Sequence, residues 1–192
     1  MGVDLAYEAT ESSDYQIIMV IGIDSDRNIY VIDYMREHIP LYDMPEQILE
    51  YAREFSPVKR VNVEHVGAQG IIKDAVNSLS SKERKVAPGI ALGVRPPSGI
   101  KKEDRLESLL APIVNRKKMF IKRSHTSLVD EMYQFPKGKN DDILDGLWYA
   151  INKARPPVSK RFDATDFIEN KVVKPVSETK KRVISWVTGQ KI

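Results

Sequence analysis

The strongest constraint on the fold is a nearly continuous hydrophobic run at residues 15–23 (YQIIMVIGI). Its β-branched residues and lack of polar alternation predict a central strand that is covered on both faces. A short apolar segment at 3–7 precedes this run, and a turn at 24–28 leads into another strand pattern at 29–37. The chain is therefore expected to begin as a three-stranded antiparallel meander.

Helical periodicity and short strands alternate through the rest of the chain, as far as about residue 154. A helix is expected to follow Asp43, with Pro45 in its first turn and Pro57 after its end. The patterns then predict a strand at 59–64, a helix that runs to about residue 80, a strand at 90–94, a helix at 101–114, an edge strand at 118–122, and helices at 127–135 and 141–153. Together these elements predict an α/β fold: a mixed sheet with helices on both faces.

The length of 192 residues, with 42% hydrophobic residues, suits one domain with a sizeable core. We expect that domain to occupy residues 1–157. Residues 158–192 are mostly polar and aperiodic, and we interpret them as a C-terminal tail, with a docking arm as one interpretation. The chain enters a strand pattern almost at its first residue, which suggests a domain cut from a longer polypeptide whose missing part is N-terminal.

Composition excludes several classes of site. The chain has no cysteine, so it has no disulfide, thiolate zinc site or cysteine nucleophile, and any metal must bind oxygen or histidine. The GxSxG and GxxxxGK[ST] motifs are absent, which argues against a serine hydrolase and a P-loop ATPase. No apolar stretch approaches the roughly 20 residues that span a bilayer, and the start does not resemble a signal peptide, so a soluble, unexported protein is expected.

Acidic residues stand at the ends of hydrophobic segments that are far apart in the sequence. Asp4 lies in the first strand pattern, directly after its opening residues MGV, Glu64 ends the fourth, and Asp141 and Asp142 begin the last helix. A buried strand gains nothing from a terminal carboxylate that must be desolvated beside others, so such ends brought together indicate a divalent-metal site. Asp145 adds a carboxylate one turn into the last helix, which is more than helix capping requires.

The expected metal is Mg²⁺ or Mn²⁺, since both accept oxygen ligands and the sequence does not choose between them. Two such ions, roughly 3.5–4 Å apart, can hold the attacking water and the leaving oxygen of a phosphodiester. Each acidic position alone also has an ordinary explanation, with Asp4 as a turn residue and Asp141 and Asp142 as helix caps. For Asp14, an accessory metal ligand and a turn cap are both open interpretations.

Basic residues gather in the segments that precede the last acidic motif, and the mild net charge of +3 makes their placement more informative than their number. They are Lys101, Lys102, Arg105, Arg116, Lys117, Lys118, Lys122, Arg123, Lys137 and Lys139. Solvated faces often carry such charges, but the shared neighbourhood favours contact with DNA phosphates. Such contacts carry no base information and weaken with salt.

Four motifs span residues 3–154: VDLAYE with the downstream Asp14, VNVEHVGAQG, KKEDRLESLLAPIVNRKKMFI and EMYQFPKGKNDDILDGLWYA. Their combination resembles the nuclease domain of the large terminase subunit of tailed bacteriophages, a branch of the RNase H-like (retroviral integrase-like) nucleases. Many members of that family have Asp where this chain has Glu64, and the longer side chain could shift the position of a metal slightly.

The resemblance implies an RNase H-like mixed sheet of five strands or slightly more, in the order 3-2-1-4-5. It implies metal-dependent endonuclease cleavage of concatemeric double-stranded DNA during genome packaging, with two bound ions. Asp4, Glu64 and Asp142 would be the catalytic ligands, and Asp141, Asp145 and Asp14 would support them. The implied partners are double-stranded DNA, an N-terminal packaging ATPase domain, the portal and the small terminase subunit, in the host cytoplasm and without a membrane.

Two other functions stay open at this point. A Holliday-junction resolvase of the same superfamily also uses four acidic residues, and it would be favoured by a dimer and by a preference for branched DNA. A non-catalytic DNA-binding or capsid-docking module would carry the same carboxylates without using them. Such a module predicts no affinity for metal.

Overall fold

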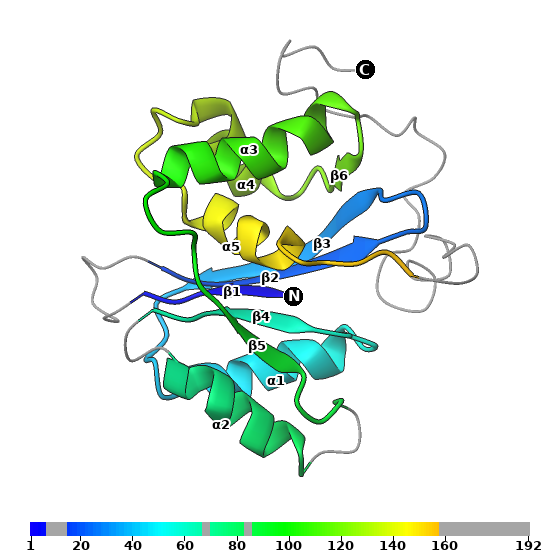
Figure 1. Cartoon of the computed structure of the whole chain (residues 1–192), viewed down its shortest axis with the longest axis vertical. Helices are drawn as coiled ribbons and strands as arrows, with labels where there is room; N and C mark the ends of the chain where they lie inside the picture. The colour runs from blue at the N-terminus through cyan, green and yellow to red at the C-terminus, as the bar shows by residue number, and fades with distance from the viewer. Residues whose placement is uncertain (7–14, 67–69, 83–85, 158–192) are drawn as a thin grey trace.

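The structure is a computed structural model, and it describes residues 1–6, 15–66, 70–82 and 86–157. Within these residues a six-stranded sheet forms the centre of the molecule (Figure 1). Its strands are β1 (Gly2–Asp4), β2 (Gln16–Ile23), β3 (Ile29–Glu37), β4 (Val61–Glu64), β5 (Ala91–Val94) and β6 (Met119–Ile121). Asp14, the predicted end of the first strand at residue 7, and the predicted tail at 158–192 lie outside the described residues.

The strand order is β5-β4-β1-β2-β3-β6. The pairs β1–β2 and β2–β3 are antiparallel, whereas β1–β4, β4–β5 and β3–β6 are parallel. The predicted antiparallel start and mixed sheet are therefore confirmed, and the first five strands have the expected order, with β6 added as an edge strand beside β3. This topology is consistent with an RNase H-like α/β fold.

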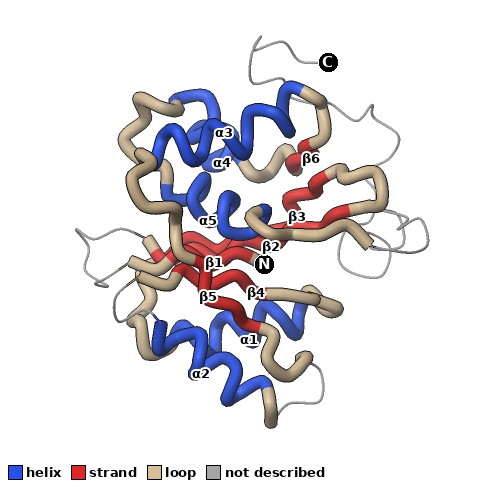
Figure 2. The backbone as a smooth tube through the Cα atoms, viewed as in Figure 1, coloured by secondary structure: helices blue, strands red, loops and turns tan. Residues whose placement is uncertain are grey.

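Helices cover both faces of the sheet, as the sequence predicts (Figures 1 and 2). They are α1 (Met44–Glu54), α2 (Gly70–Ser80), α3 (Lys102–Asn115), α4 (Thr126–Gln134) and α5 (Asp142–Ile151). Helices α1 and α2 lie on one face, α5 lies directly on the other, and α3 and α4 lie outside α5. Within the described residues, no helix is both long and apolar enough to cross a membrane.

Each face of the sheet has its own hydrophobic core, and neighbouring residues of β2 belong to different cores. Ile18 and Val20 pack in the core with α1 and α2, while Ile17 and Met19 pack in the core with α3, α4 and α5. All four side chains are buried. The prediction that this strand is covered on both faces is therefore confirmed.

The register of β1 and β4 decides which residues face α5. Gly2 pairs with Asn62 and Val3 with Val63, and both valines belong to the core on the α1/α2 face. Because side chains alternate along a strand, Asp4 and Glu64 point to the opposite face, toward α5. Helix α5 comes so close there that a Cβ added at Gly2 would lie 2.1 Å from the backbone nitrogen of Ala150.

Candidate acidic site

The structure brings Asp4, Glu64 and the acidic start of α5 together at one end of the sheet. Asp4 is the last residue of β1, and Glu64 is the last residue of the adjacent parallel strand β4. Both carboxylates therefore stand at the carboxyl ends of neighbouring strands, where open α/β sheets place their ligands. Helix α5 crosses the same strands and supplies Asp142 and Asp145.

Asp4 and Glu64 lie close together, because they end two adjacent strands that pair in parallel with Val3 beside Val63. Burial raises the pKa of Asp4 well above its usual value, and the negative charges of Asp145 and Glu64 raise it further. Crowded carboxylates repel one another and take up protons when no cation is present. The charge of Lys102 acts in the opposite direction, but burial and the neighbouring carboxylates outweigh it.

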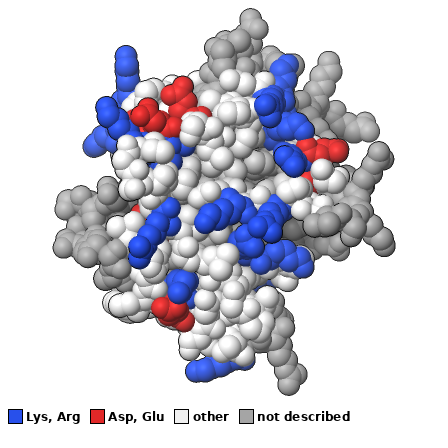
Figure 3. All heavy atoms as spheres, viewed as in Figure 1, with Lys and Arg blue, Asp and Glu red and all other residues white. Residues whose placement is uncertain are grey.

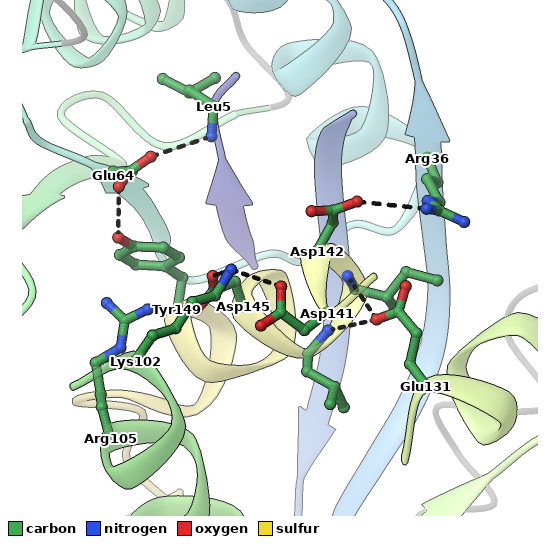
Figure 4. Close-up of polar contacts among 12 residues, drawn as sticks. Leu5, Arg36, Glu64, Lys102, Arg105, Glu131, Asp141, Asp142, Asp145 and Tyr149 are labelled. Carbon is green, nitrogen blue, oxygen red and sulfur yellow. Dashed lines mark hydrogen bonds and ion pairs between the residues drawn. The ribbon is translucent and has the colours of Figure 1, made fainter. Parts of the chain in front are cut away.

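Glu64 is held by two donors from different elements (Figure 4). Its Oε1 accepts a hydrogen bond from the Tyr149 hydroxyl at 2.9 Å, and its Oε2 accepts one from the backbone N–H of Leu5 at 3.4 Å. The Tyr149 side chain is fully buried, as expected for a core residue. Burial and the neighbouring Glu64 raise the pKa of the Tyr149 hydroxyl, so it remains a donor to this carboxylate.

Asp145 is buried, with 5% of the residue exposed, and pairs with two cations from α3. The Arg105 guanidinium binds its Oδ1 through Nη2, and the Lys102 ammonium lies 2.5 Å from its Oδ2. Burial raises the pKa of Asp145 even though both cations act to lower it. Arg105 is itself buried, and its guanidinium lies 4.6 Å from the centroid of the Trp148 ring.

Lys102 also reaches the start of α5. Its Nζ lies 2.7 Å from Oδ1 of Asp141, so one ammonium bridges Asp141 and Asp145 (Figure 4). Burial alone would lower the pKa of Lys102, but the two carboxylates raise it above its ordinary value. The ammonium therefore stays charged inside the acidic cluster.

Asp142 lies at the flank of this cluster. Its Oδ2 is 3.3 Å from Nη2 of Arg36 on β3, and the Arg36 guanidinium lies 4.0 Å from the centroid of the Tyr15 ring. The carboxylates that act most strongly on Asp4 are Asp145 and Glu64. Asp145 therefore lies near enough to Asp4 for its charge to act there, and the predicted role of Asp142 as the third ligand stays a prediction.

The amino-terminal end of α5 is capped by a side chain from another helix, α4. Glu131 on α4 accepts the backbone N–H groups of Ile143 at 3.0 Å and Leu144 at 3.2 Å through Oε2. The Asp141 side chain makes no capping hydrogen bond. Burial raises the pKa of Glu131 to about 7, although the donated N–H groups act in the opposite direction. Glu131 thus does the capping that a local aspartate would ordinarily do.

The donor set consists of carboxylate oxygens, which suit Mg²⁺ and Mn²⁺. Across residues 1–6, 15–66, 70–82 and 86–157, no three Asp, Glu or His side chains are arranged to hold one ion together as they stand. Glu64 accepts hydrogen bonds from Tyr149 and Leu5, while Asp145 is occupied by Lys102 and Arg105. The residues fit a hard divalent ion in kind, and existing contacts must be exchanged for such an ion to bind.

The basic residues predicted to bind DNA divide into three groups: those that point inward, those that are half-buried and those that are exposed. Lys102 and Arg105 point inward to Asp145, so we do not assign them to an outer DNA surface. Lys118 donates to the backbone carbonyl of Asp26, and Lys122 is half-buried. The exposed members are Lys101, Arg116, Lys117, Arg123, Lys137 and Lys139. Figure 3 shows Lys and Arg side chains distributed over one face of the molecule, with several across its middle.

Sequence reasoning missed several residues that shape the site. Tyr149 follows Asp145 by four positions, so both lie on one side of α5, and this spacing could have identified the hydroxyl donor. Lys102 and Arg105 are predicted as DNA contacts, and their role beside Asp145 was missed, although their i, i+3 spacing places them on one side of a helix. Arg36 and Glu131 carry no local signal, since their partners are distant in the sequence.

Comparisons of the chain with protein-family models, curated proteins and solved structures gave no match.

Proposed function

We propose that this chain is a metal-dependent nuclease domain that hydrolyses phosphodiester bonds in double-stranded DNA. The observation that carries the proposal is the meeting of Asp4, Glu64 and Asp145, from three elements, at one edge of the sheet. Gathering like charges at a partly buried position does not stabilise a fold, and perturbed carboxylates in such a place are typical of functional sites.

The side chains have distinct roles in this proposal. Asp4, Glu64 and Asp145 would bind Mg²⁺ or Mn²⁺, one or two ions, with Asp141 and Asp142 beside them. A bound ion of this kind lowers the pKa of water and stabilises the charge on a leaving oxygen. The residues around the ligands fix their orientation: the Tyr149 hydroxyl holds Glu64, and the Arg105 guanidinium holds Asp145.

Exposed cations flank the acidic cluster in the chain and suit the backbone of a DNA duplex. Lys101 directly precedes Lys102, and Lys139 lies two residues before Asp141. Both side chains belong to exposed residues, so their ammonium groups can meet phosphates without breaking a buried ion pair. Binding through such contacts is independent of sequence and falls steeply with salt.

The resemblance to terminase nucleases supports a narrower proposal about the substrate. The substrate would be concatemeric viral DNA, cut during genome packaging, with an N-terminal packaging ATPase domain, the portal and the small terminase subunit as partners in the host cytoplasm. The support consists of the four motifs and of the strand order, which is the one that the resemblance implies.

The test is cleavage of supercoiled plasmid in Mn²⁺ by the wild type and by Asp4→Asn, Glu64→Gln and Asp145→Asn. Each of the three variants should lose activity by on the order of 100-fold or more, as is typical when a group that stabilises a transition state is removed. Asp104→Asn, at an exposed carboxylate on α3, is the matched control and should cut like the wild type. Asp142→Asn decides whether the flanking aspartate is also needed.

Circular dichroism on each variant separates a lost site from a lost fold. If all three folded variants nick plasmid at the wild-type rate, the assignment of the site is wrong. Loss of cleavage in Asp142→Asn but not in Asp145→Asn would move the third ligand to the position that the resemblance implies.

The ion pairs favour a second candidate, a non-catalytic DNA-binding or docking module. Arg36, Lys102 and Arg105 already neutralise much of the negative charge on α5, as they would in a purely structural network. This candidate predicts no Mn²⁺ binding at the acidic cluster and no cleavage by any variant. A calorimetric titration with Mn²⁺ separates the two candidates.

A further inference from the structure

Lys102 is the internal cation of the acidic cluster. Its Nζ lies 2.5 Å from Oδ2 of Asp145 and 2.7 Å from Oδ1 of Asp141, and its charge also acts on Asp4. It therefore occupies a position among carboxylates from two elements, where the proposed nuclease needs a divalent ion.

Both oxygens of Asp145 are already used. Arg105 binds Oδ1, and Lys102 binds Oδ2. A metal ion coordinates a carboxylate oxygen at about 2.0–2.6 Å, so an ion on Asp145 would stand directly against the Lys102 or Arg105 cation, and the like charges would repel. Binding of a metal by Asp145 therefore favours withdrawal of one of the two internal cations.

Arg105 is the cation that stays. Only 8% of its side chain is exposed, and its guanidinium stacks over Trp148 inside the core. Withdrawal of Arg105 would leave a buried charge without a partner, which is strongly unfavourable. The guanidinium is therefore best understood as a permanent support for Oδ1 of Asp145.

Lys102 is the cation that can leave. Its side chain is 39% exposed, and it is the first residue of α3, next to the exposed residues 97–101. The apolar stripe of α3, with Leu106 and Leu110 fully buried, lies further along the helix. A change of rotamer can thus carry the ammonium into solvent without moving the packed part of α3.

We propose that Lys102 is a counter-cation that a divalent ion displaces from Asp145 and Asp141, and that it sets the metal concentration at which the site fills. This inference rests on the proposed function, because it takes the acidic cluster to be a metal site. In the metal-free protein the ammonium holds the carboxylates together; in the loaded protein it points away from them. Lys102 stabilises the metal-free site, and this stabilisation is lost when the metal binds. The affinity of the site for metal is therefore lower with Lys102 than without its charge.

The experiment is a calorimetric titration of the full chain with MnCl₂, for the wild type, Lys102→Met and Lys102→Arg. Met keeps the length of the side chain but removes the competing charge, so the Kd for Mn²⁺ should fall about tenfold, equivalent to about 1.4 kcal/mol. Lys102→Arg keeps the charge and should bind Mn²⁺ as the wild type does. Lys101→Met, at the exposed neighbour, is the matched control and should leave the Kd unchanged.

A second background keeps the test valid if Lys102→Met fails to fold without metal. Asp141→Asn removes one of the carboxylates that Lys102 bridges, so the double variant Lys102→Met/Asp141→Asn keeps the net charge of the wild type. The double variant should bind Mn²⁺ about tenfold more tightly than Asp141→Asn alone, by the same charge competition.

The possible results are distinct. A Kd that is unchanged or higher in Lys102→Met, with Mn²⁺ still bound, overturns the role of Lys102 and leaves the metal site in place. Absence of Mn²⁺ binding in every protein overturns both the role of Lys102 and the proposed function. Binding that is measurable only in the variants without the lysine charge supports the competition most strongly.

Discussion

The two faces of the sheet differ in what they bury. On the α1/α2 face the core consists of apolar side chains such as Val63, Leu49 and Val76, all fully buried. On the α5 face the buried residues include the charged side chains of Arg105, Glu131 and Asp145 among the apolar ones.

The same strands serve both faces, since Val3 points into the apolar core and the next residue, Asp4, points into the acidic site. Burying charges is expensive even when they are paired, and a buried ion pair is weak evidence for a gain in stability. The apolar face is sufficient to explain why the chain folds, whereas the other face departs from the apolar pattern where its carboxylates meet. Such local departures are expected at functional sites.

The largest effect on stability should come from the apolar face. Leu49→Ala removes a fully buried side chain on α1, and we expect the free energy of unfolding to fall by about 2–5 kcal/mol. Urea unfolding measures this change. The folded fraction should keep the wild-type affinity for Mn²⁺, because Leu49 lies across the sheet from the acidic site; a large loss of affinity in folded protein would show that the two faces are not independent.

A smaller loss of stability is expected when Glu131, the α4 residue that caps α5, is replaced. Glu131→Ala removes the acceptor of two backbone N–H groups and should lower the free energy of unfolding by about 1–3 kcal/mol. Glu131→Gln retains an acceptor and should lose less. Equal losses in the two variants would show that the carboxylate itself is required, and that an amide acceptor of the same length cannot replace it.

Glu131 should also give stability a pH dependence. Burial raises its pKa from 4.5 in the unfolded chain to about 7, so the folded state holds the proton more tightly. The resulting contribution to stability is fully present below about pH 4.5 and is lost as the pH rises through about 7. Thermal unfolding between pH 4 and 8 should therefore show this decline in the wild type more strongly than in Glu131→Gln.

The smallest expected change in stability is a gain, and it comes from the acidic site. Asp4→Asn removes a carboxyl group whose pKa is raised by burial and by Asp145 and Glu64, and we expect a gain of about 1 kcal/mol for metal-free protein at pH 8. The gain should shrink as the pH falls, because the raised pKa lets the wild-type Asp4 bind a proton more readily. A loss of stability at pH 8 would mean that Asp4 supports the fold.

The sequence predicts the strands that carry the site better than the side-chain contacts within it. The positions of Asp4 and Glu64 follow from strand patterns that end in a carboxylate, and the expected strand order makes those ends neighbours. The order of helices and strands could be read in the same way, because each has its own hydrophobic period.

The contacts of the helices could not be read from local patterns. Every residue from Ile143 to Ile151 is buried, so the sequence of α5 does not show which side meets the sheet or whether Asp142 or Asp145 lies beside Asp4. Lys102 and Arg105 look like surface cations, but the way α3 packs on α5 turns them inward. Tertiary packing decides the rotation of each helix, and local sequence does not encode it.

The most direct measurement is anomalous diffraction from crystals of the wild-type protein soaked in MnCl₂. We predict an anomalous peak about 2.0–2.6 Å from carboxylate oxygens of Asp4, Glu64 and Asp145, with the Lys102 ammonium withdrawn from Asp145. Well-diffracting crystals that show no peak at this cluster, or peaks only on surface carboxylates elsewhere, would contradict the assignment of a metal site to the α5 face.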